Sequence, residues 1–572
     1  MKRFSHAARI LALLLSLALL SGCAGSGGGS HSSAFELVPF DQMEYVRPDM
    51  DALEEQFTAA AAFAESASRR DGDKLTELLN GCWDAYDAFY TMENLAMLRS
   101  DIDQSDESAA DEYQFCQESE VRIEEWMDLL LVACAASEAE VPSNLLAGYD
   151  QGDREPYSDR ELELMERESD LLVEYWRAMM LDEIQLDGRT VSYMDYISDP
   201  GITAAEYQAA NLAYCRACNQ AAAPVYAELI KTRRAMAAEF GYDSYEELQY
   251  AYFARDYTPD QVRAYLDDVA EVVAGFNGEL MARDPYSLVS YDALSSTALL
   301  NLLRRATADM GESVEAAFDL MKTYRLYDVS ASVNKAPGAY TVYLDSYEAP
   351  FIFLGAYGDV EDFLDLSHEF GHFVDAYVNY NATGSLDLAE LYSQTMANLT
   401  LHKCRDLLSG DSYRNLLLLH LLSTMNVFTE QAAYADFENR AYQLPDRELT
   451  AENLNALALE CAERFGAVTP GQEELSSLYW AQVNHLFEYP FYVISYCVSA
   501  DAALQIAELE RSDPGEGVAC YGNILDWQED AFLSELERVG LESPFAPGRP
   551  ARALALAEAI LEEDLAEMLN AA

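Results

Sequence analysis

Apolar residues recur at three- and four-residue spacing along most of the chain from about residue 49 to residue 311, as at Leu75 and Leu79. This spacing collects apolar side chains on one face of a helix. A helix start is marked at Thr258-Pro259-Asp260-Gln261, which offers a cap residue, a proline in the first helical position and the glutamine of a capping box. No fixed-period repeat indicates a solenoid. The pattern predicts packed helices throughout this part.

The periodicity changes near Pro337. Residues 339–344 (AYTVYL) and 351–354 (FIFL) are rich in β-branched and aromatic residues, with a turn-like segment between them. They predict a short hairpin within a helical protein. Helical spacing resumes near Val360 and continues to the C-terminus. It is broken by Gly and Pro at 465–472 and 543–550. We therefore expect a mainly α fold with a small β element.

Length and composition allow one large core or two to three packed domains, since 50% of the 572 residues are hydrophobic. We expect an N-terminal helical domain over residues 36–200 and a catalytic domain over residues 201–572.

The first residues are typical of an export signal. Lys2, Arg3 and Arg9 precede a largely apolar run, 11–20, that is too short to span a bilayer. The run ends in Leu20-Ser21-Gly22-Cys23, which resembles a bacterial lipobox. We expect a lipoprotein signal at 1–22, lipidation of Cys23 and a Gly/Ser-rich tether at 23–35. The chain would then be anchored outside the cytoplasm to a bacterial membrane; a cleaved signal or an uncleaved anchor are the alternatives.

The charge balance limits the partners. Asp and Glu number 100 against 36 Lys and Arg, for a formal net charge of −64. Such a surface repels phosphate backbones, so we expect no nucleic-acid partner. It favours solubility and can attract cationic peptides, but a solvated acidic surface without a specific partner is the favoured interpretation.

Cysteine usage indicates no disulfide framework. Without Cys23, nine of the ten cysteines remain, scattered in apolar helical contexts typical of small core residues. Cys215 and Cys218 form a CxxC, but no second pair or nearby His pair completes a metal site. Packing or one local disulfide is favoured over redox or metal use.

The stretch His368-Glu369-Phe370-Gly371-His372 carries the chemistry. On a helix, positions i and i+4 share one face, so both imidazoles can bind one Zn²⁺ ion, and Glu369 can act as general base toward an activated water. We predict this helix over about residues 360–378. With only seven histidines in the chain, roughly 0.015 chance matches are expected, which favours a metal site over two core histidines.

A catalytic zinc site needs a third ligand. Glu390 lies 18 residues after His372, at the start of a helical pattern from Leu388 to Leu408. A short loop and an antiparallel return helix would bring it back to the metal. Asp387 and Asp375 are weaker candidates, and Asp375 can instead orient a ligand imidazole. From spacing alone these alternatives stay open.

These residues resemble the oligoendopeptidase F and thimet oligopeptidase family of gluzincin zinc metallopeptidases. The resemblance rests on HEFGH, on Glu390 within ELYSQ, on Gly338-Ala339-Tyr340 and on residues 485–496 (HLFEYPFYVISY). It covers roughly residues 252–503. It implies one Zn²⁺ per chain held by His368, His372 and Glu390, and a two-lobed helical shell around a deep substrate channel, with the small β element beside the zinc helix.

The resemblance also implies roles outside the motif. His485, Tyr492 and Tyr496 would steady the oxyanion that forms on the substrate carbonyl. Gly338, Ala339, Tyr340 and Tyr489 would bind substrate, with the strand edge pairing to an extended peptide. From their spacing, we expect the three tyrosines 489, 492 and 496 to share one helical face; an aromatic core stripe is the alternative.

The chain departs from the family pattern at three places. Asp375 replaces a third histidine, Ala397 replaces a glutamate, and Cys497-Val498-Ser499 stands where a glycine is usual. These changes put metal affinity, loop flexibility and substrate preference in doubt, but the four primary residues are retained.

We therefore expect a zinc-dependent oligoendopeptidase that hydrolyses internal bonds of short unfolded peptides outside the cytoplasm. A carboxypeptidase or peptidyl-dipeptidase on the same scaffold, a non-catalytic peptide-binding lipoprotein and a structural surface lipoprotein are the alternatives. Cleavage preference and oligomeric state do not follow from the sequence.

Overall fold

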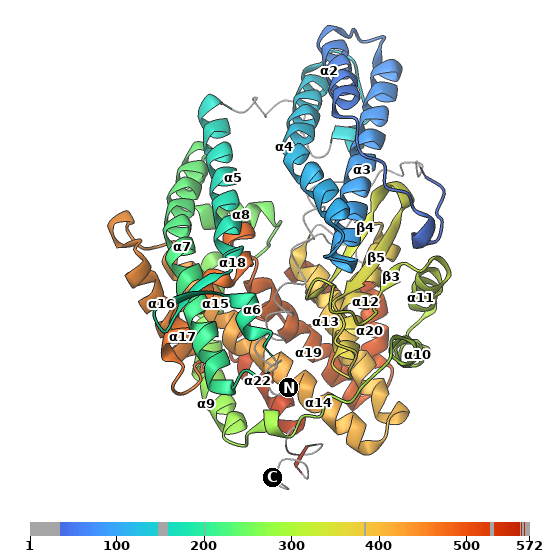
Figure 1. The fold of residues 1–572 in the computed structure, drawn as a ribbon. Coiled ribbons are helices and arrows are strands. Elements are labelled where there is room, and N and C mark those ends of the chain that lie inside the picture. The colour runs from blue at the N-terminus through green and yellow to red at the C-terminus, as the bar shows by residue number, and fades with distance from the viewer. Residues whose placement is uncertain are drawn as a thin grey trace. The chain divides into compact units, whose positions relative to one another are not determined.

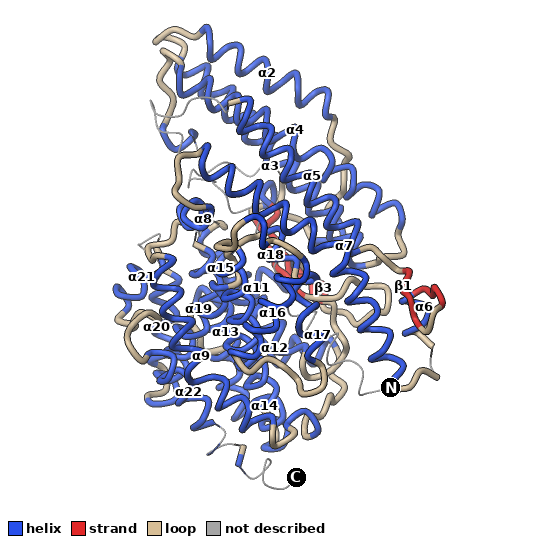
Figure 2. Tube along the Cα trace, turned by 90° about the vertical axis from the view of Figure 1, so that its left-hand side faces the viewer, coloured by secondary structure: helices blue, strands red, loops and turns tan. Residues whose placement is uncertain are grey.

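The computed structural model describes residues 35–146, 158–199, 201–381, 385–526 and 531–560, together with 562, 565 and 566. The predicted signal, the lipidation site Cys23 and nearly all of the tether lie outside the described residues. The described chain is mainly helical with a few short strands, which confirms the predicted fold class (Figure 1; Figure 2). No helix within it is both long enough and apolar enough to cross a membrane.

The chain forms two compact units, each built from separate stretches of sequence. Among the described residues, the sheet unit comprises 35–146 and 292–381, and the helical unit comprises 158–291 and 385–566. The predicted division near residue 200 differs from this arrangement, because the helical unit takes segments from both sides of that position. Contacts between segments far apart in sequence decide the division, and local periodicity does not report such contacts.

Three long helices form the N-terminal part of the sheet unit: α2 (Met50–Ser66), α3 (Gly72–Ile102) and α4 (Glu107–Ala136). They pack side by side (Figure 1) around a core that includes Phe57, Leu79 and Leu130, all fully buried. The short helices η2 (Phe40–Gln42) and η3 (Ser143–Leu146) flank them. The apolar residues whose spacing predicted this helix, such as Leu75 and Leu79, thus lie on the face of α3 that fills this core.

The predicted hairpin is present. β4 (Ala339–Leu344) pairs antiparallel with β5 (Ala349–Leu354), and β3 (Tyr327–Asp328) joins β5 in parallel, so β4 lies at one edge of the sheet. The remaining elements of the unit are α10 (Ser296–Ala306), α11 (Glu312–Tyr324), η5 (Asp345–Tyr347) and α12 (Asp362–Asn379). Asn94 of α3 donates from Nδ2 to the carbonyl oxygen of Tyr343 at 3.0 Å and so ties the helices to the strand edge.

The helical unit begins with α5 (Asp159–Met179), which packs along α7 (Ala204–Glu239). Between them lie a small hairpin, β1 (Glu183–Leu186) and β2 (Arg189–Ser192), and α6 (Tyr193–Ile197). This hairpin was not predicted, because strands of four residues are too short to show a periodic pattern.

The capping box predicted at Thr258 is present. The Thr258 side chain accepts from the Gln261 N–H, and Gln261 reaches back to the Thr258 N–H at the start of α9 (Pro259–Met281). The preceding helix is α8 (Tyr245–Tyr252).

The rest of this unit is a series of helices in which α13 and α19 pack closely against each other. The predicted break at 465–472 falls between α16 and α17. The break at 543–550 falls between α21 and α22 except for Arg549 and Pro550, which begin α22. The helices are α13 (Leu386–Leu407), α14 (Gly410–Asn426), α15 (Ala432–Ala441), α16 (Ala451–Arg464), α17 (Glu473–Leu478), α18 (Asn484–Glu488), α19 (Ile494–Ser512), α20 (Glu516–Leu525), α21 (Phe532–Val539) and α22 (Arg549–Ala559).

All nine cysteines within the described residues are buried free thiols, which confirms their role as small core residues. Cys215 and Cys218 lie on α7 without a disulfide between them. Gln482 donates from Nε2 to the Cys215 sulfur at 3.0 Å. The local disulfide considered for this CxxC is therefore absent.

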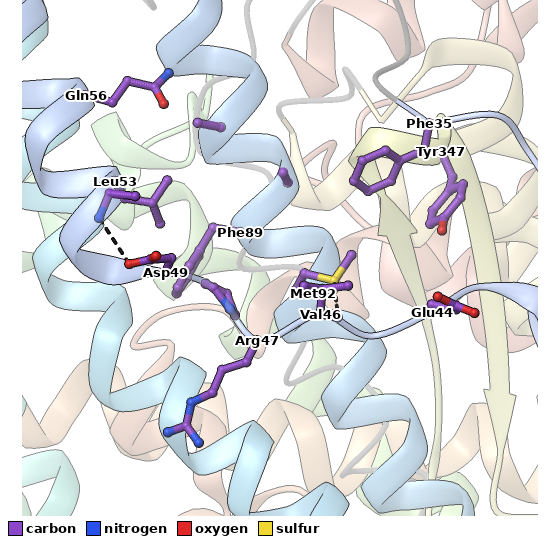
Figure 3. A pocket seen from close by; sticks show the side chains of 14 residues that line it. Phe35, Glu44, Val46, Arg47, Asp49, Leu53, Gln56, Phe89, Met92 and Tyr347 are labelled. Atoms are coloured by element: carbon purple, nitrogen blue, oxygen red, sulfur yellow. Dashed lines mark hydrogen bonds between the residues drawn. The ribbon is translucent and has the colours of Figure 1, made fainter.

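A cavity of about 550 Å³ opens in the sheet unit between residues 44–49, α2 and α3. Figure 3 shows Leu53, Phe89 and Met92 on its helical side, with Phe35 and Tyr347 at the other end. None of the predicted site residues lines it, so this cavity is distinct from the histidine motif.

Candidate active site

The histidine motif lies on α12, as predicted. Its N-terminal end is fixed by Asp362, whose carboxylate accepts the N–H groups of Tyr357 and Gly358 at 2.9 and 2.8 Å. Phe363 and Phe370 are fully buried, and the Phe370 ring packs edge-on against Phe318 of α11, with centroids 5.9 Å apart. The rings of His368 and His372 lie one turn apart, with centroids 5.0 Å from each other. Helix α12 also packs against β5.

Burial keeps both imidazoles in the form that binds a metal. It lowers the pKa of His368 to about 4 and the pKa of His372 well below its usual value, the second also through the neighbouring ring. A neutral ring has a free lone pair, whereas an imidazolium has none. At neutral pH both residues are therefore ready to act as ligands.

Glu369 is 1% exposed and is held by the strand edge. The hydroxyl of Thr341 on β4 lies 2.9 Å from Glu369 Oε2 and 3.0 Å from the Glu369 carbonyl oxygen. This contact orients the carboxylate relative to the sheet. Sequence reasoning missed Thr341, although the alternation of β4 could have indicated that this polar residue faces away from Tyr340.

Glu390 lies in the second turn of α13 and is fully buried. The Tyr492 hydroxyl donates to its Oε1 at 2.9 Å, and the Ser393 hydroxyl lies 3.4 Å from its Oε2. Burial raises the pKa of Glu390 to about 7, while the hydrogen bonds from Tyr492, Gln394 and Ser393 oppose that rise. A cation beside the carboxylate would relieve the cost of burying its charge.

His368, His372 and Glu390 each offer a ligand atom, and these atoms all lie within 4.8 Å of one another. Within the described residues, no other group of three or more His, Cys, Asp or Glu side chains meets this condition. Two neutral imidazoles and one carboxylate match the donor set of catalytic zinc sites, which keep a fourth position open. The residues present therefore fit a zinc ion.

The weaker ligand candidates are engaged elsewhere. Asp387 accepts from the Tyr257 hydroxyl at 2.9 Å and lies 3.7 Å from Arg255 Nε. Asp375 accepts from Asn379 Nδ2 at 2.7 Å. Neither joins the three-residue group.

Arg255 links the starts of two helices near Glu390. Besides its ion pair with Asp387 on α13, its Nη2 donates to the Ser495 hydroxyl on α19 at 2.8 Å. Its side chain is fully buried. Sequence reasoning missed this residue, because an arginine before a helix cap carries no local signal of burial.

His485 and the three predicted tyrosines form one aromatic group. The ring centroid of His485 lies 6.3, 5.5 and 6.0 Å from those of Tyr489, Tyr492 and Tyr496. The Tyr496 hydroxyl lies 3.3 Å from His485 Nε2, and burial lowers the pKa of His485 to about 4. The structure thus brings these four side chains together.

The prediction that these tyrosines share a helical face is wrong. Helix α18 ends at Glu488 and α19 begins at Ile494, so Tyr489 and Tyr492 lie in the connection between them. Phe491 adopts φ +64°, and its N–H donates to Glu438 Oε2 at 2.7 Å. The turn follows from Pro490 and this buried acceptor, which the spacing of the tyrosines does not reveal.

The strand residues predicted to bind substrate are partly used within the fold. Tyr340 is 6% exposed, stacks on Phe353 at 4.8 Å and donates its hydroxyl to Asp101 at 2.7 Å. Ala339 is buried beside it, and Gly338 has φ +97°, which favours glycine. Substrate contact at Gly338, Ala339, Tyr340 and Tyr489 stays a prediction.

The helical fold, the helix that carries the HExxH motif and Glu390 beside the two histidines together indicate a protein of the metallopeptidase class. Two models of one peptidase family match the chain: the peptidase M3 N-terminal domain over residues 40–140, and peptidase family M3 over residues 314–527. The chain belongs to peptidase family M3.

Individual relatives agree with this placement. Group B oligopeptidase PepB of Streptococcus agalactiae is 28% identical over 275 residues, which span 45% of this chain and 43% of that protein. The structure of PZ peptidase A with an inhibitor has a TM-score of 0.73 at 21% sequence identity. The match covers 92% of this chain and 100% of the PZ peptidase A chain. The oligoendopeptidase F of Enterococcus faecium has a TM-score of 0.57 at 15% identity, covering 91% and 99%. At these identities the solved structures show a shared fold.

Proposed function

We propose that this protein is a zinc-dependent oligoendopeptidase that hydrolyses internal bonds of short peptides. The observation that carries the proposal is the convergence of His368, His372 and Glu390 ligand atoms within 4.8 Å, next to a buried Glu369. Bound zinc would polarise the scissile carbonyl and lower the pKa of the attacking water. Membership of peptidase family M3 and the likeness to an oligopeptidase support the same conclusion.

In this proposal the chain's own residues divide the remaining work. Glu369, oriented by Thr341, accepts the proton of the attacking water and delivers it to the leaving amine. His485 and Tyr496 donate to the oxygen of the scissile carbonyl as its charge develops. Tyr492 bonds to Glu390, so we assign it to positioning that carboxylate ahead of donating to substrate.

Removing the metal tests the function directly. An internally quenched peptide of about ten residues should be cleaved by the purified protein, and dialysis against a chelator should lower kcat/KM by about 100-fold or more. One equivalent of Zn²⁺ per chain should restore it. Chelator-insensitive cleavage would exclude the mechanism.

The same sample separates the alternatives. Mass spectrometry of the products distinguishes internal cuts from the terminal cuts of a carboxypeptidase or peptidyl-dipeptidase. Tight peptide binding without turnover at full zinc loading would indicate a binding lipoprotein, and absence of bound metal would favour a structural role.

We also propose that the protein acts outside the cytoplasm, tethered to a bacterial membrane through lipid on Cys23. Support comes from the basic start, the apolar run 11–20 and the small residues before Cys23. In a bacterial expression host, Cys23→Ser should move the protein from the membrane fraction to the soluble fraction. An unchanged distribution would contradict lipidation at this residue.

A further inference from the structure

Arg255 follows helix α8 in a turn that fixes the start of its side chain. The Arg255 N–H donates to the Tyr250 carbonyl oxygen at 3.0 Å, and the Ala254 N–H donates to the Ala251 carbonyl oxygen at 3.2 Å. These two bonds, with Ala254 at φ +50°, form the Schellman motif that ends many helices. Glycine is usual at the left-handed position, so an alanine there holds the turn against backbone strain.

Three aromatic rings surround the Arg255 guanidinium. Its central carbon lies 4.7, 5.0 and 5.4 Å from the ring centroids of Tyr250, Phe253 and Tyr257. The faces of aromatic rings attract a cation, and the Arg255 side chain is 0% exposed. The turn and the rings together fix where the guanidinium lies in the helical unit.

Arg255 contacts α13 through Asp387, which lies one helical turn before Glu390. Arg255 Nε lies 3.7 Å from Asp387 Oδ2, and the Tyr257 hydroxyl donates to the same oxygen at 2.9 Å. Positions i and i+3 of a helix are neighbours, so the side chains of Asp387 and Glu390 lie on adjoining parts of one face of α13. A rotation of this helix end would move both carboxylates together. The ion pair therefore restrains the Glu390 carboxylate.

Arg255 contacts α19 through Ser495, the residue before Tyr496. Its Nη2 donates to the Ser495 hydroxyl at 2.8 Å, and Ser495 is fully buried. The Ser495 N–H donates to the Tyr492 carbonyl oxygen at 2.8 Å, so this residue joins the connection that carries Tyr492 to the first turn of α19. The contact therefore restrains the point from which Tyr496 projects.

Two direct hydrogen bonds also join α13 to α19. The Ser499 hydroxyl donates to the Asp387 carbonyl oxygen at 2.7 Å, and Gln394 Nε2 donates to the Tyr496 carbonyl oxygen at 3.2 Å. These bonds hold the two helices to each other. Arg255 adds a fixed point from a third segment, between α8 and α9, and binds one side chain on each helix.

We propose that Arg255 is a positioning residue that sets the Glu390 carboxylate through Asp387 and the Tyr496 hydroxyl through Ser495. The inference rests on the proposed peptidase function, because it names a residue that holds the same site together. A guanidinium suits this role, since its N–H groups point in fixed, different directions and can bind two partners at once.

Zinc affinity tests the contact to α13. Arg255→Gln should weaken zinc binding by about tenfold in competition with a chelating indicator, as loss of other outer partners of metal ligands does. The visible absorption of the Co²⁺-substituted protein should change as well, because it reports the geometry of the ligands. Asp387→Asn breaks the same ion pair from α13 and should change both readouts in the same direction. Native zinc affinity and a native Co²⁺ spectrum in both variants would overturn the proposal.

Turnover tests the contact to α19. Ser495→Ala removes only the hydroxyl that accepts from Arg255, and it provides the test if Arg255→Gln folds poorly. We expect kcat on a quenched peptide to fall about tenfold, as misplacing a catalytic group does, with zinc affinity within about twofold of native. Arg255→Lys keeps the charge without the fork, so it should hold zinc better than Arg255→Gln does but lose kcat. Native kcat in Ser495→Ala would show that Tyr496 is not set through Ser495.

A matched control separates positioning from stability. Arg549 forms a second buried pair with Asp501 of α19, at 2.7 Å and with side chains 4% and 0% exposed. Arg549→Gln should lower the Tm about as much as Arg255→Gln does, because each leaves a buried carboxylate unpaired. Its zinc affinity, Co²⁺ spectrum and kcat should stay native. If Arg549→Gln changes zinc affinity and spectrum as much as Arg255→Gln does, Arg255 acts only through stability and the proposal is wrong.

Failure of the Arg255 role and failure of the peptidase function give different results. Zinc binding is measured without a peptide. If the native protein binds zinc and cleaves nothing, the proposed function fails, and the zinc affinities of the native protein, Arg255→Gln and Arg549→Gln still test Arg255. If the native protein cleaves peptides and Arg255→Gln matches it in zinc affinity, spectrum and kcat, only the positioning role falls.

Discussion

Glu369→Gln should lower kcat on any cleaved peptide by about 10²–10⁴-fold while leaving one zinc ion per chain. Glutamine has nearly the same shape, and its oxygen can still accept from the Thr341 hydroxyl, which lies 2.9 Å from Oε2 of the native carboxylate. The amide cannot accept the proton of the attacking water. The loss should therefore appear in kcat, measured by single-turnover and steady-state assays, with metal content measured by elemental analysis.

Glu315→Gln is the matched control for this prediction. It removes the same charge from an exposed position on α11, the helix that packs against α12, and should leave kcat near the native value. Full activity in Glu369→Gln would show that another group takes the proton, and the proposed mechanism would then be wrong.

Glu390→Gln should weaken zinc binding by more than about 100-fold, because outer partners of metal ligands alone are worth 10–100-fold. The native carboxylate is fully buried with a pKa of about 7, so a neutral amide in its place leaves no unpaired charge in the apo fold. The variant should keep its helical circular dichroism and lose metal in competition with a chelating indicator. Glu508→Gln, exposed on α19, should bind zinc as the native protein does.

Tyr492→Phe provides an intermediate step in the same measurement. It removes the hydroxyl that donates to Glu390 Oε1 at 2.9 Å but keeps the ring that packs beside His485 and Tyr496. We expect zinc affinity to fall about 10–100-fold.

If Glu390→Gln binds zinc with the affinity of the native protein, Glu390 is not a zinc ligand.

Local patterns predicted much of the fold. The hairpin at 339–344 and 351–354, the helix around the histidine motif and the capping box at Thr258 are all present, because each depends on neighbouring residues. The β1–β2 hairpin and the composition of the two units were not predicted. They depend on pairings and contacts that short segments do not encode individually.

The residues of the candidate site were likewise predicted only in part. The two histidines and Glu369 follow from one helical turn, whereas Glu390 followed from its spacing and the family resemblance. Thr341, Arg255 and the bond from Tyr492 to Glu390 were missed. Each joins segments that are far apart in the chain.

The sequence by itself determined the helical character, the metal-binding motif on one helix face and the acidic surface, since these follow from residue type and short-range spacing. Only the tertiary structure decided that the Glu390 carboxylate lies near both rings and that Phe491 turns the chain at Glu438. The physical reason is that burial and long-range contacts set the energy of a charged or polar group, and neither is defined until distant segments pack together.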